Sequence, residues 1–161
     1  YETPNVSGRM DNLRAAILRP QLRRLPEQVA AWNARYRAVE GGLRGTPGLQ
    51  TIDRPEAESI VGSSIQFLLP GWDAGQVQEV VARCRARGVE LKWFGAAEPV
   101  AFTSSHPSWR YIEPQSLPRT DAVLSGLFDM RVPLTFAVAD CTHIAEIIIH
   151  CAKALDLRRA A

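Results

Sequence analysis

The chain has 161 residues, of which 46% are hydrophobic and 22% charged, and this composition is typical of an ordinary globular domain with a core of its own. A formal net charge of +2 is too small to indicate a nucleic-acid partner without a clustered basic patch. No stretch approaches the length of a membrane span, and no basic start is followed by an apolar run. We therefore expect a cytoplasmic protein without a membrane partner, and the start at Tyr1 suggests a piece excised from a longer one.

The cysteines and histidines of the chain, which in other proteins often form disulfides or bind metals, are not spaced for either role here. Cys84, Cys141 and Cys151 lack CxxC spacing and lie in apolar or helical surroundings, so we expect reduced thiols. His143 and His150 are seven residues apart on one predicted helix, whereas metal-binding pairs are typically three or four apart. The sequence therefore predicts no metal site.

The first quarter of the chain predicts two helices. Ser7 caps the first, and apolar residues recur at helical spacing until Pro20 interrupts it. The second runs from Pro26, a favourable first-turn position, to Arg44, where Gly41, Gly42 and Gly45 bring it to an end. Its apolar stripe consists of Val29, Trp32, Tyr36, Val39 and Leu43. Arginines make the first helix basic, but we interpret them as solvated or packed on another domain rather than as a nucleic-acid surface.

The remaining sequence predicts strands alternating with helices. Residues 64–69, 89–94 and 129–134 read as strands, with a short extended piece at 49–52. A capping-box pattern at Asp73 and Gln76 begins a helix that Gly88 ends. A short helix is expected over 120–127, and Asp140 caps a last helix that buries Ile144, Ile147, Ile148, Cys151 and Leu155. Residues 95–118 form a long loop, whose aromatic content argues against disorder.

These elements predict an α+β fold. We expect a small antiparallel or mixed sheet of about three strands, covered by helices on one side. A long connecting helix precedes it. Neither internal repeats nor low-complexity tracts are present.

Several short segments resemble the DegT/StrS family of sugar aminotransferases, which use pyridoxal phosphate (PLP). Family members carry an Asn-x-Arg-Met segment that opens a helix running through Ala-Ala to Gln-Leu. The matching stretch here begins at Ser7-Gly8-Arg9-Met10 and continues through Ala15-Ala16 to Gln21-Leu22. Weaker matches are Arg87-Gly88-Val89-Glu90-Leu91, Leu117-Pro118 and Arg131-Val132-Pro133-Leu134.

The resemblance implies a role for the N-terminal residues in holding the cofactor. In the family, the asparagine of the first segment reaches across a homodimer interface to the phosphate of the neighbouring subunit's PLP. Ser7 occupies that position here, and the resemblance makes Ser7, Asn5 and Arg9 the candidate cofactor-binding residues. The alternative interpretation of Ser7 is a simple helix cap. The resemblance also divides the chain into an interface helix at residues 1–25, belonging to the large PLP domain, and a C-terminal small domain at 26–161.

A second set of residues is expected to line the substrate pocket. Many family members have a tyrosine and a histidine after the second strand, where this chain has Trp93 and Phe94. The resemblance implies a keto-sugar substrate and an amino-acid donor, with aromatic stacking and a few polar contacts. The candidate substrate residues are Lys92, Trp93, Phe94, His106, Trp109 and Arg110. Alternatively, the two tryptophans fill the core and His106 and Arg110 are solvated.

The family's Schiff-base lysine would precede Tyr1. Lys92 and Lys153 are the only lysines of the chain, and neither occupies the family's position. We therefore expect no catalytic residue in this chain, and only weak PLP binding and no amino transfer by the chain alone. Two other functions remain open: a noncatalytic dimerisation or ligand-binding module, and a family member that dehydrates sugars because histidine replaces the lysine.

Overall fold

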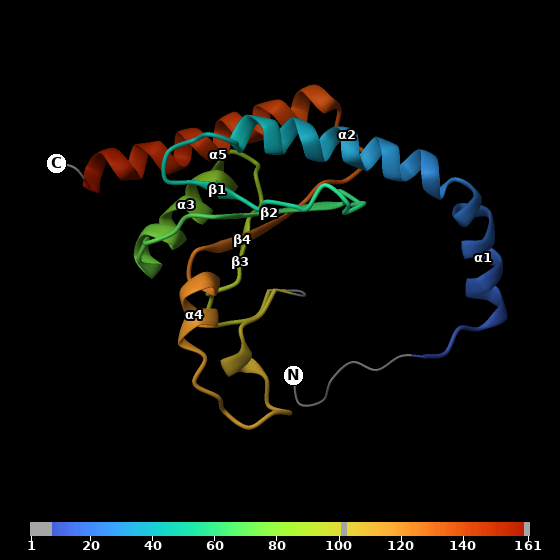
Figure 1. Ribbon diagram of the computed structural model, residues 1–161, viewed down its shortest axis with the longest axis horizontal. Helices are drawn as coiled ribbons and strands as arrows, with labels where there is room; N and C mark the ends of the chain where they lie inside the picture. Colours follow the sequence, from blue (N-terminus) through green and yellow to red (C-terminus); the bar gives the residue numbers. More distant parts are fainter. Residues whose placement is uncertain (1–7, 101–102, 160–161) are drawn as a thin grey trace.

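A computed structural model describes residues 8–100 and 103–159 (Figure 1). Five α-helices, four strands and one short 3₁₀ helix follow one another along these residues. Their order is α1 (Asn12–Arg23), α2 (Leu25–Leu43), β1 (Gln50–Thr51), β2 (Ser64–Leu68), α3 (Ala74–Ala86), β3 (Lys92–Trp93), η1 (His106–Ser108), α4 (Pro118–Leu124), β4 (Leu127–Arg131) and α5 (Val138–Arg159). The predicted α+β class is confirmed.

The four strands form one antiparallel sheet in the order β1-β2-β4-β3. Along β2, Ile65 and Phe67 are buried while their neighbours are half-buried, as alternation predicts. Phe67 pairs with Phe128 of β4, and the two rings stack with centroids 5.1 Å apart. The expected short extended piece is β1, which makes the sheet one strand larger than the three predicted. The predicted strands at 89–94 and 129–134 are shorter or shifted, because hydrogen-bonded pairing extends only over β3 and β4.

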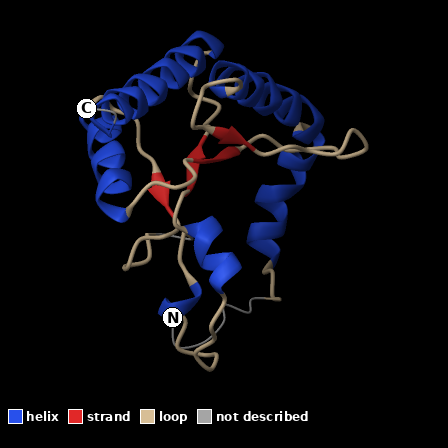
Figure 2. Ribbon diagram, turned by 60° about the vertical axis from the view of Figure 1, so that its left-hand side comes forward, coloured by secondary structure: helices blue, strands red, loops and turns tan. Residues whose placement is uncertain are grey.

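Three helices cover one face of the sheet, and the hydrophobic core lies between these two layers (Figures 1 and 2). α2 and α5 pack along each other, and α3 packs against α5. The predicted long helix from Pro26 to Arg44 is confirmed as α2, which ends at Leu43. Within it, a Cβ at Gly42 would come 2.6 Å from the Cβ of Ala145 in α5. A glycine is therefore needed for the close approach of the two helices.

The predicted start of α3 is confirmed in detail. The Asp73 carboxylate accepts a hydrogen bond of 2.9 Å from the Gln76 backbone N–H, and the Gln76 side chain accepts one of 3.0 Å from the Asp73 N–H. Gly88 follows the end of the helix with φ of 82°, a conformation that favours glycine. The cap at Asp73 and the turn at Gly88 define the two ends of α3 and lead the chain toward β3.

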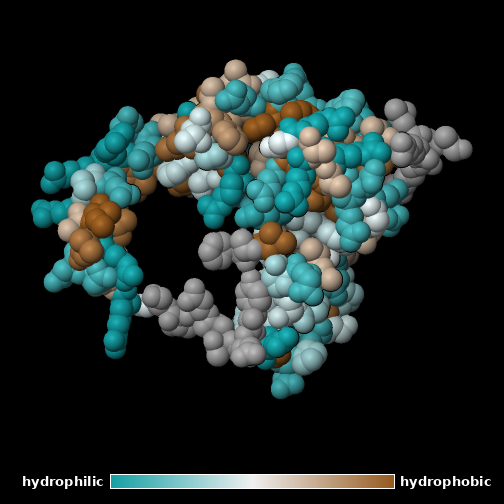
Figure 3. Space-filling view, turned by 180° about the vertical axis from the view of Figure 1, so that it is seen from behind, coloured by the Kyte–Doolittle hydropathy of each residue, from teal (hydrophilic) through white to brown (hydrophobic). Residues whose placement is uncertain are grey.

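α1 differs from the other long helices because all of its residues are exposed. Its cap is Asp11, which accepts a hydrogen bond of 2.8 Å from the Arg14 backbone N–H, so the prediction that Ser7 begins the helix is wrong. Pro20 lies inside α1 instead of ending it, and water can satisfy the exposed carbonyl that its missing N–H leaves free. The space-filling view shows apolar atoms gathered on this helix, across an open gap from the rest of the molecule (Figure 3).

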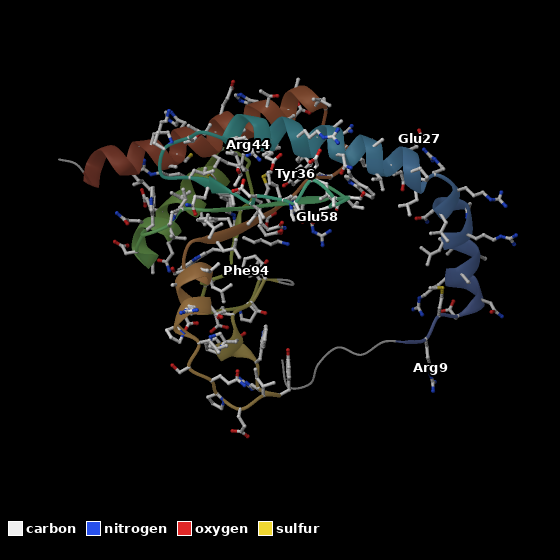
Figure 4. The ribbon with its side chains drawn as sticks, in the orientation of Figure 1. Arg9, Glu27, Tyr36, Arg44, Glu58 and Phe94 are labelled. Carbon is white, nitrogen blue, oxygen red and sulfur yellow. The ribbon has the colours of Figure 1, made fainter. Side chains whose placement is uncertain are left out.

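A network of charged groups ties the loop after β1 to α2 (Figure 4). Arg54 donates hydrogen bonds to the Tyr36 hydroxyl at 3.4 Å and to Glu58 at 2.7 Å, and its guanidinium lies 5.8 Å from the centre of the Tyr36 ring. The hydrogen bond to Tyr36 is the main cause of a raised pKa for Arg54. Arg44 makes a 3.2 Å ion pair with Glu40, a neighbour on the same helix. We assign this network a structural role.

Candidate functional site

The candidate cofactor residues lie at the very start of the chain. Asn5 and Ser7 are outside the described residues. Arg9 is exposed and precedes α1, and Figure 4 shows its side chain pointing away from α2, α3 and α5, the helices that cover the sheet. The N-terminus of a helix favours anions, so the position of Arg9 is compatible with a phosphate contact.

Lys92 lies on the face of the sheet that the three helices do not cover. Its cross-strand partner is Asp129 of β4, which in turn pairs with Gln66 of β2. Because paired residues of antiparallel strands point to the same face, these side chains are neighbours. The Gln66 amide donates a 2.6 Å hydrogen bond to the Asp129 carboxylate. This face therefore carries polar groups in a row across three strands.

Trp93 lies on the opposite side of the sheet from Lys92, because successive strand residues alternate. It pairs with Phe128 and packs against the core, while its indole N–H donates a 2.8 Å hydrogen bond to the Ser125 carbonyl. A Cβ at Gly95 would come 2.7 Å from two indole atoms. The ring is thus held flat against a backbone that has room only for glycine.

Phe94 and the long loop complete the predicted substrate residues. The Phe94 N–H donates a 3.0 Å hydrogen bond to the Leu127 carbonyl, which extends the ladder between β3 and β4 by one residue. Trp109 donates its indole N–H to the Ser104 hydroxyl at 2.9 Å and stacks on Tyr111, with ring centroids 6.0 Å apart. Arg110, which lies between Trp109 and Tyr111 in the sequence, is exposed.

His106 lies in η1 and is only 9% exposed. Its Nε2 lies 2.7 Å from the Asp121 carboxylate of α4. This contact joins the long loop to the helix that follows it. Asp121 lies inside α4, and its hydrogen-bond partner is fifteen residues away in the sequence. Nothing in the spacing of the two residues predicts the pair.

The six candidate substrate residues do not line a single hollow in the described part of the chain. Lys92 lines a hollow of about 440 Å³ together with Glu90 and Arg131 at the edge of the sheet. Trp93 lines two hollows: one of about 510 Å³, which it shares with Lys92, and a smaller one of about 270 Å³, which we call the Trp93 hollow. The other residues of the Trp93 hollow include Gly95, Ser105, Asp121, Leu124 and Ser125. The hollow therefore brings together Trp93 and the carboxylate that holds His106.

The cysteines are free and buried, as the sequence predicts. Burial and the neighbouring Cys151 raise the pKa of the Cys84 thiol far above its ordinary range. Burial also raises the pKa of Cys141. Thiols of this kind are poor nucleophiles, so they pack rather than react.

His143 lies 3.0 Å from Glu146, one turn along α5. In the described ranges, no three histidine, cysteine or acidic side chains gather where they could hold a metal ion. Among the same residues, none of the helices has the length and apolar character that crossing a membrane requires.

Comparison with known proteins gives a family match along most of the chain. The model of the DegT/DnrJ/EryC1/StrS aminotransferase family matches residues 1–149. No curated protein matches the sequence. The solved structures that resemble this one include the aminotransferase TlmJ from Streptoalloteichus hindustanus, with a TM-score of 0.73 and 20% identity over 89% of this chain and 36% of that one.

Two other similar structures are those of DesV from S. venezuelae in complex with a ketimine intermediate and DesI in the presence of its TDP-sugar product. DesV has a TM-score of 0.69 and 20% identity, and DesI has a TM-score of 0.68 and 16% identity. Both matches cover 94% of this chain and 39% of the other. The chain therefore spans less than two-fifths of the length of each of these three proteins, and it shares the fold of that part.

Proposed function

Because the chain belongs to the DegT/DnrJ/EryC1/StrS aminotransferase family, we propose that it is the C-terminal domain of a PLP-dependent enzyme that transfers an amino group to a keto-sugar. The observation that carries the proposal is the family match over residues 1–149. The fold shared with TlmJ, DesV and DesI supports it. The keto-sugar is nucleotide-linked in this proposal, and an amino acid is the donor.

The role of this chain toward the cofactor is to hold its phosphate. PLP supplies the electron sink for amino transfer when it is bound. Arg9, at the exposed start of α1, is a cation placed for a phosphate contact, and Asn5 and Ser7 supply hydrogen-bond donors beside it in sequence. In a homodimer these residues reach the neighbouring subunit's cofactor.

Neither of the two lysines of the chain, Lys92 and Lys153, is the lysine that holds PLP in this proposal. Lys153 is exposed on α5. Lys92 lies on β3 and, like Lys153, does not occupy the position of the Schiff-base lysine in the family. We therefore propose that the Schiff-base lysine is encoded upstream of Tyr1, and that the chain alone neither binds PLP tightly nor transfers an amino group.

The substrate side of the proposal uses the residues around the sheet edge and the long loop. Trp93, Phe94 and Trp109 offer apolar ring faces for a sugar, and Lys92, His106 and Arg110 offer polar contacts. Although Lys92 and Trp93 point to opposite faces of the sheet, both line the hollow of about 510 Å³, where one ligand contacts them both in this proposal.

The test uses the polypeptide that the gene encodes, including the sequence upstream of Tyr1. It is incubated with PLP, a TDP-linked keto-sugar and L-glutamate, and the 2-oxoglutarate released is measured. We expect release by the longer polypeptide and none by residues 1–161 alone. Loss of water from the sugar without 2-oxoglutarate would identify a dehydratase. The absence of any upstream PLP domain would favour the dimerisation or ligand-binding module.

The phosphate contact is tested by substitution in the same polypeptide. Arg9→Ala removes the proposed cation, and we expect PLP affinity to fall by about tenfold, the loss typical of one charged hydrogen bond. Arg23→Ala is the matched control, since Arg23 is also exposed but lies in the last turn of α1. Equal affinities for the two variants would exclude a phosphate role for Arg9.

A further inference from the structure

The contact between His106 and Asp121 has consequences for the Trp93 hollow. Asp121 is a carboxylate with a side chain 53% exposed, whereas the side chain of His106 is only 8% exposed. The 2.7 Å contact joins one carboxylate oxygen, Oδ1, to His106 Nε2. Among the described residues, none donates a hydrogen bond to the second oxygen, Oδ2. A buried histidine thus fixes the orientation of a carboxylate that remains available to a ligand.

The ring beside this carboxylate is also fixed. Trp93 is held by its hydrogen bond to the Ser125 carbonyl and by its contact with Gly95. Both Gly95 and Ser125 line the hollow. An aromatic ring and a hydrogen-bond acceptor are therefore presented together on groups that are already ordered, which lowers the entropic cost of binding.

The chemistry of the hollow matches a hydroxylated ring. A flat apolar surface at Trp93 suits the C–H face of a pyranose, and the Asp121 carboxylate accepts hydrogen bonds from ring hydroxyls. Ser105, which also lines the hollow, adds a hydroxyl. The volume of about 270 Å³ is slightly below the roughly 300–1,000 Å³ of typical ligand pockets, so it suits one ring rather than a whole nucleotide sugar.

We propose that Asp121 is a specificity-determining residue that binds hydroxyl groups of a pyranose ring in the Trp93 hollow, and that His106 is the positioning residue that orients its carboxylate. This inference rests on the proposed function, because it assumes that the ligand is the sugar part of the substrate. It adds to that function a recognition group, Asp121, that the sequence does not indicate.

The experiment monitors binding directly, without cofactor or turnover. The full chain, labelled with ¹⁵N, is titrated with methyl α-D-glucopyranoside, and the indole N–H signals of its four tryptophans are followed by NMR. Trp93→Phe assigns the signal of Trp93. We expect this signal to shift and saturate while those of Trp32 and Trp72 stay in place. A Trp93 signal that does not move up to the solubility limit of the sugar overturns the proposal.

Substitutions then test the carboxylate. Asp121→Asn keeps the shape of the side chain but loses its charge, and we expect affinity to fall by about tenfold. Asp53→Asn is the matched control, because Asp53 is an exposed carboxylate near the opposite edge of the sheet and should leave affinity unchanged. Cyclohexylmethanol, an apolar ring with a single hydroxyl, should bind more weakly than the sugar. Equal binding of both compounds, or an Asn variant that binds normally, would contradict the role of Asp121.

The positioning role of His106 requires its own readout. His106→Gln retains an Nε2 donor, whereas His106→Phe removes it. We expect the Phe variant to lose affinity to the same extent as Asp121→Asn while its Trp93 signal in the free protein stays in place, and the Gln variant to recover part of the loss. Equal loss in both variants, with the Trp93 signal displaced, would show that His106 only maintains the local structure. Because these titrations need no PLP, they can fail while the longer polypeptide still transfers amino groups.

Discussion

The sheet and the helices α2, α3 and α5 that cover it form what we call the body of the molecule. The helices of the body and α1 carry apolar residues at the same helical spacing, but only those of the body are buried. Tyr36, Val39 and Leu43 of α2 are between 0% and 2% exposed. Leu13 and Leu22 of α1 are 71% and 64% exposed. The difference teaches that periodicity predicts a helix but not what covers it. The body has a core of its own, whereas the apolar residues of α1 are free to contact a surface beyond the described residues.

The largest expected effect compares a buried residue of the body with an exposed one of α1. Phe67→Ala removes a ring that is fully buried and stacked on Phe128, so we expect the free energy of unfolding to fall by about 3–5 kcal/mol. Leu22→Ala on α1 should change it by less than about 0.5 kcal/mol. Urea denaturation followed by circular dichroism measures both. Similar losses would mean that α1 is packed as part of the body.

The second prediction uses two neighbouring glycines of α2. Gly42→Ala places a Cβ against Ala145, and we expect a loss of about 1–3 kcal/mol from overpacking. Gly41→Ala meets no atom within 4 Å and should stabilise by about 0.5–1 kcal/mol, because alanine has less freedom than glycine in the unfolded chain. Changes of the same sign in thermal unfolding would refute the close contact between α2 and α5.

The two regions also have equivalent helix caps. Asp73→Ala removes the cap of α3 and should cost about 1 kcal/mol of unfolding free energy. Asp11→Ala removes the same kind of cap from α1, and we expect it to lower local helicity without shifting the main transition. Hydrogen exchange of the first-turn amides distinguishes local from global effects. A shift of the main transition by Asp11→Ala would place α1 within the cooperative unit.

The smallest predicted effect depends on pH. Because the pKa of Cys84 is raised in the folded protein above its ordinary value of 9.0, the unfolded chain loses this proton first. Stability is therefore unaffected below that value and decreases as pH rises above it, with a slope that approaches about 1.4 kcal/mol per pH unit. Urea denaturation at two pH values on either side of 9 measures the slope. Cys84→Ala should show a shallower slope, and an identical one would be inconsistent with a raised pKa.

The body could largely be predicted from the sequence because local signals and tertiary packing agree there. The capping pattern at Asp73 and the alternation around Phe67 both correspond to observed structure. Predictions based on single residues were less successful. Pro20 does not end α1, since exposure to water outweighs the local preference, and Asp11 rather than Ser7 caps that helix.

The candidate site was harder to predict than the fold, because its contacts join distant residues. Lys92 and Trp93 point to opposite faces of the sheet, as strand alternation requires, and the hollow at the sheet edge that both line follows from tertiary structure. His106 was identified, but its partner Asp121 was not, because the long loop carries no periodicity that would relate them. Pairing across a loop is set by tertiary structure and has no signature in one sequence.

The central claim is that this chain is part of a PLP enzyme whose cofactor lysine lies upstream of Tyr1. The most direct measurement is mass spectrometry of protein incubated with PLP and then reduced with borohydride, which fixes PLP to the lysine that holds it. We predict stoichiometric labelling of a lysine upstream of Tyr1 in the longer polypeptide, and no specific labelling of residues 1–161 alone. Stoichiometric labelling of Lys92 or Lys153 in the isolated chain would contradict the account.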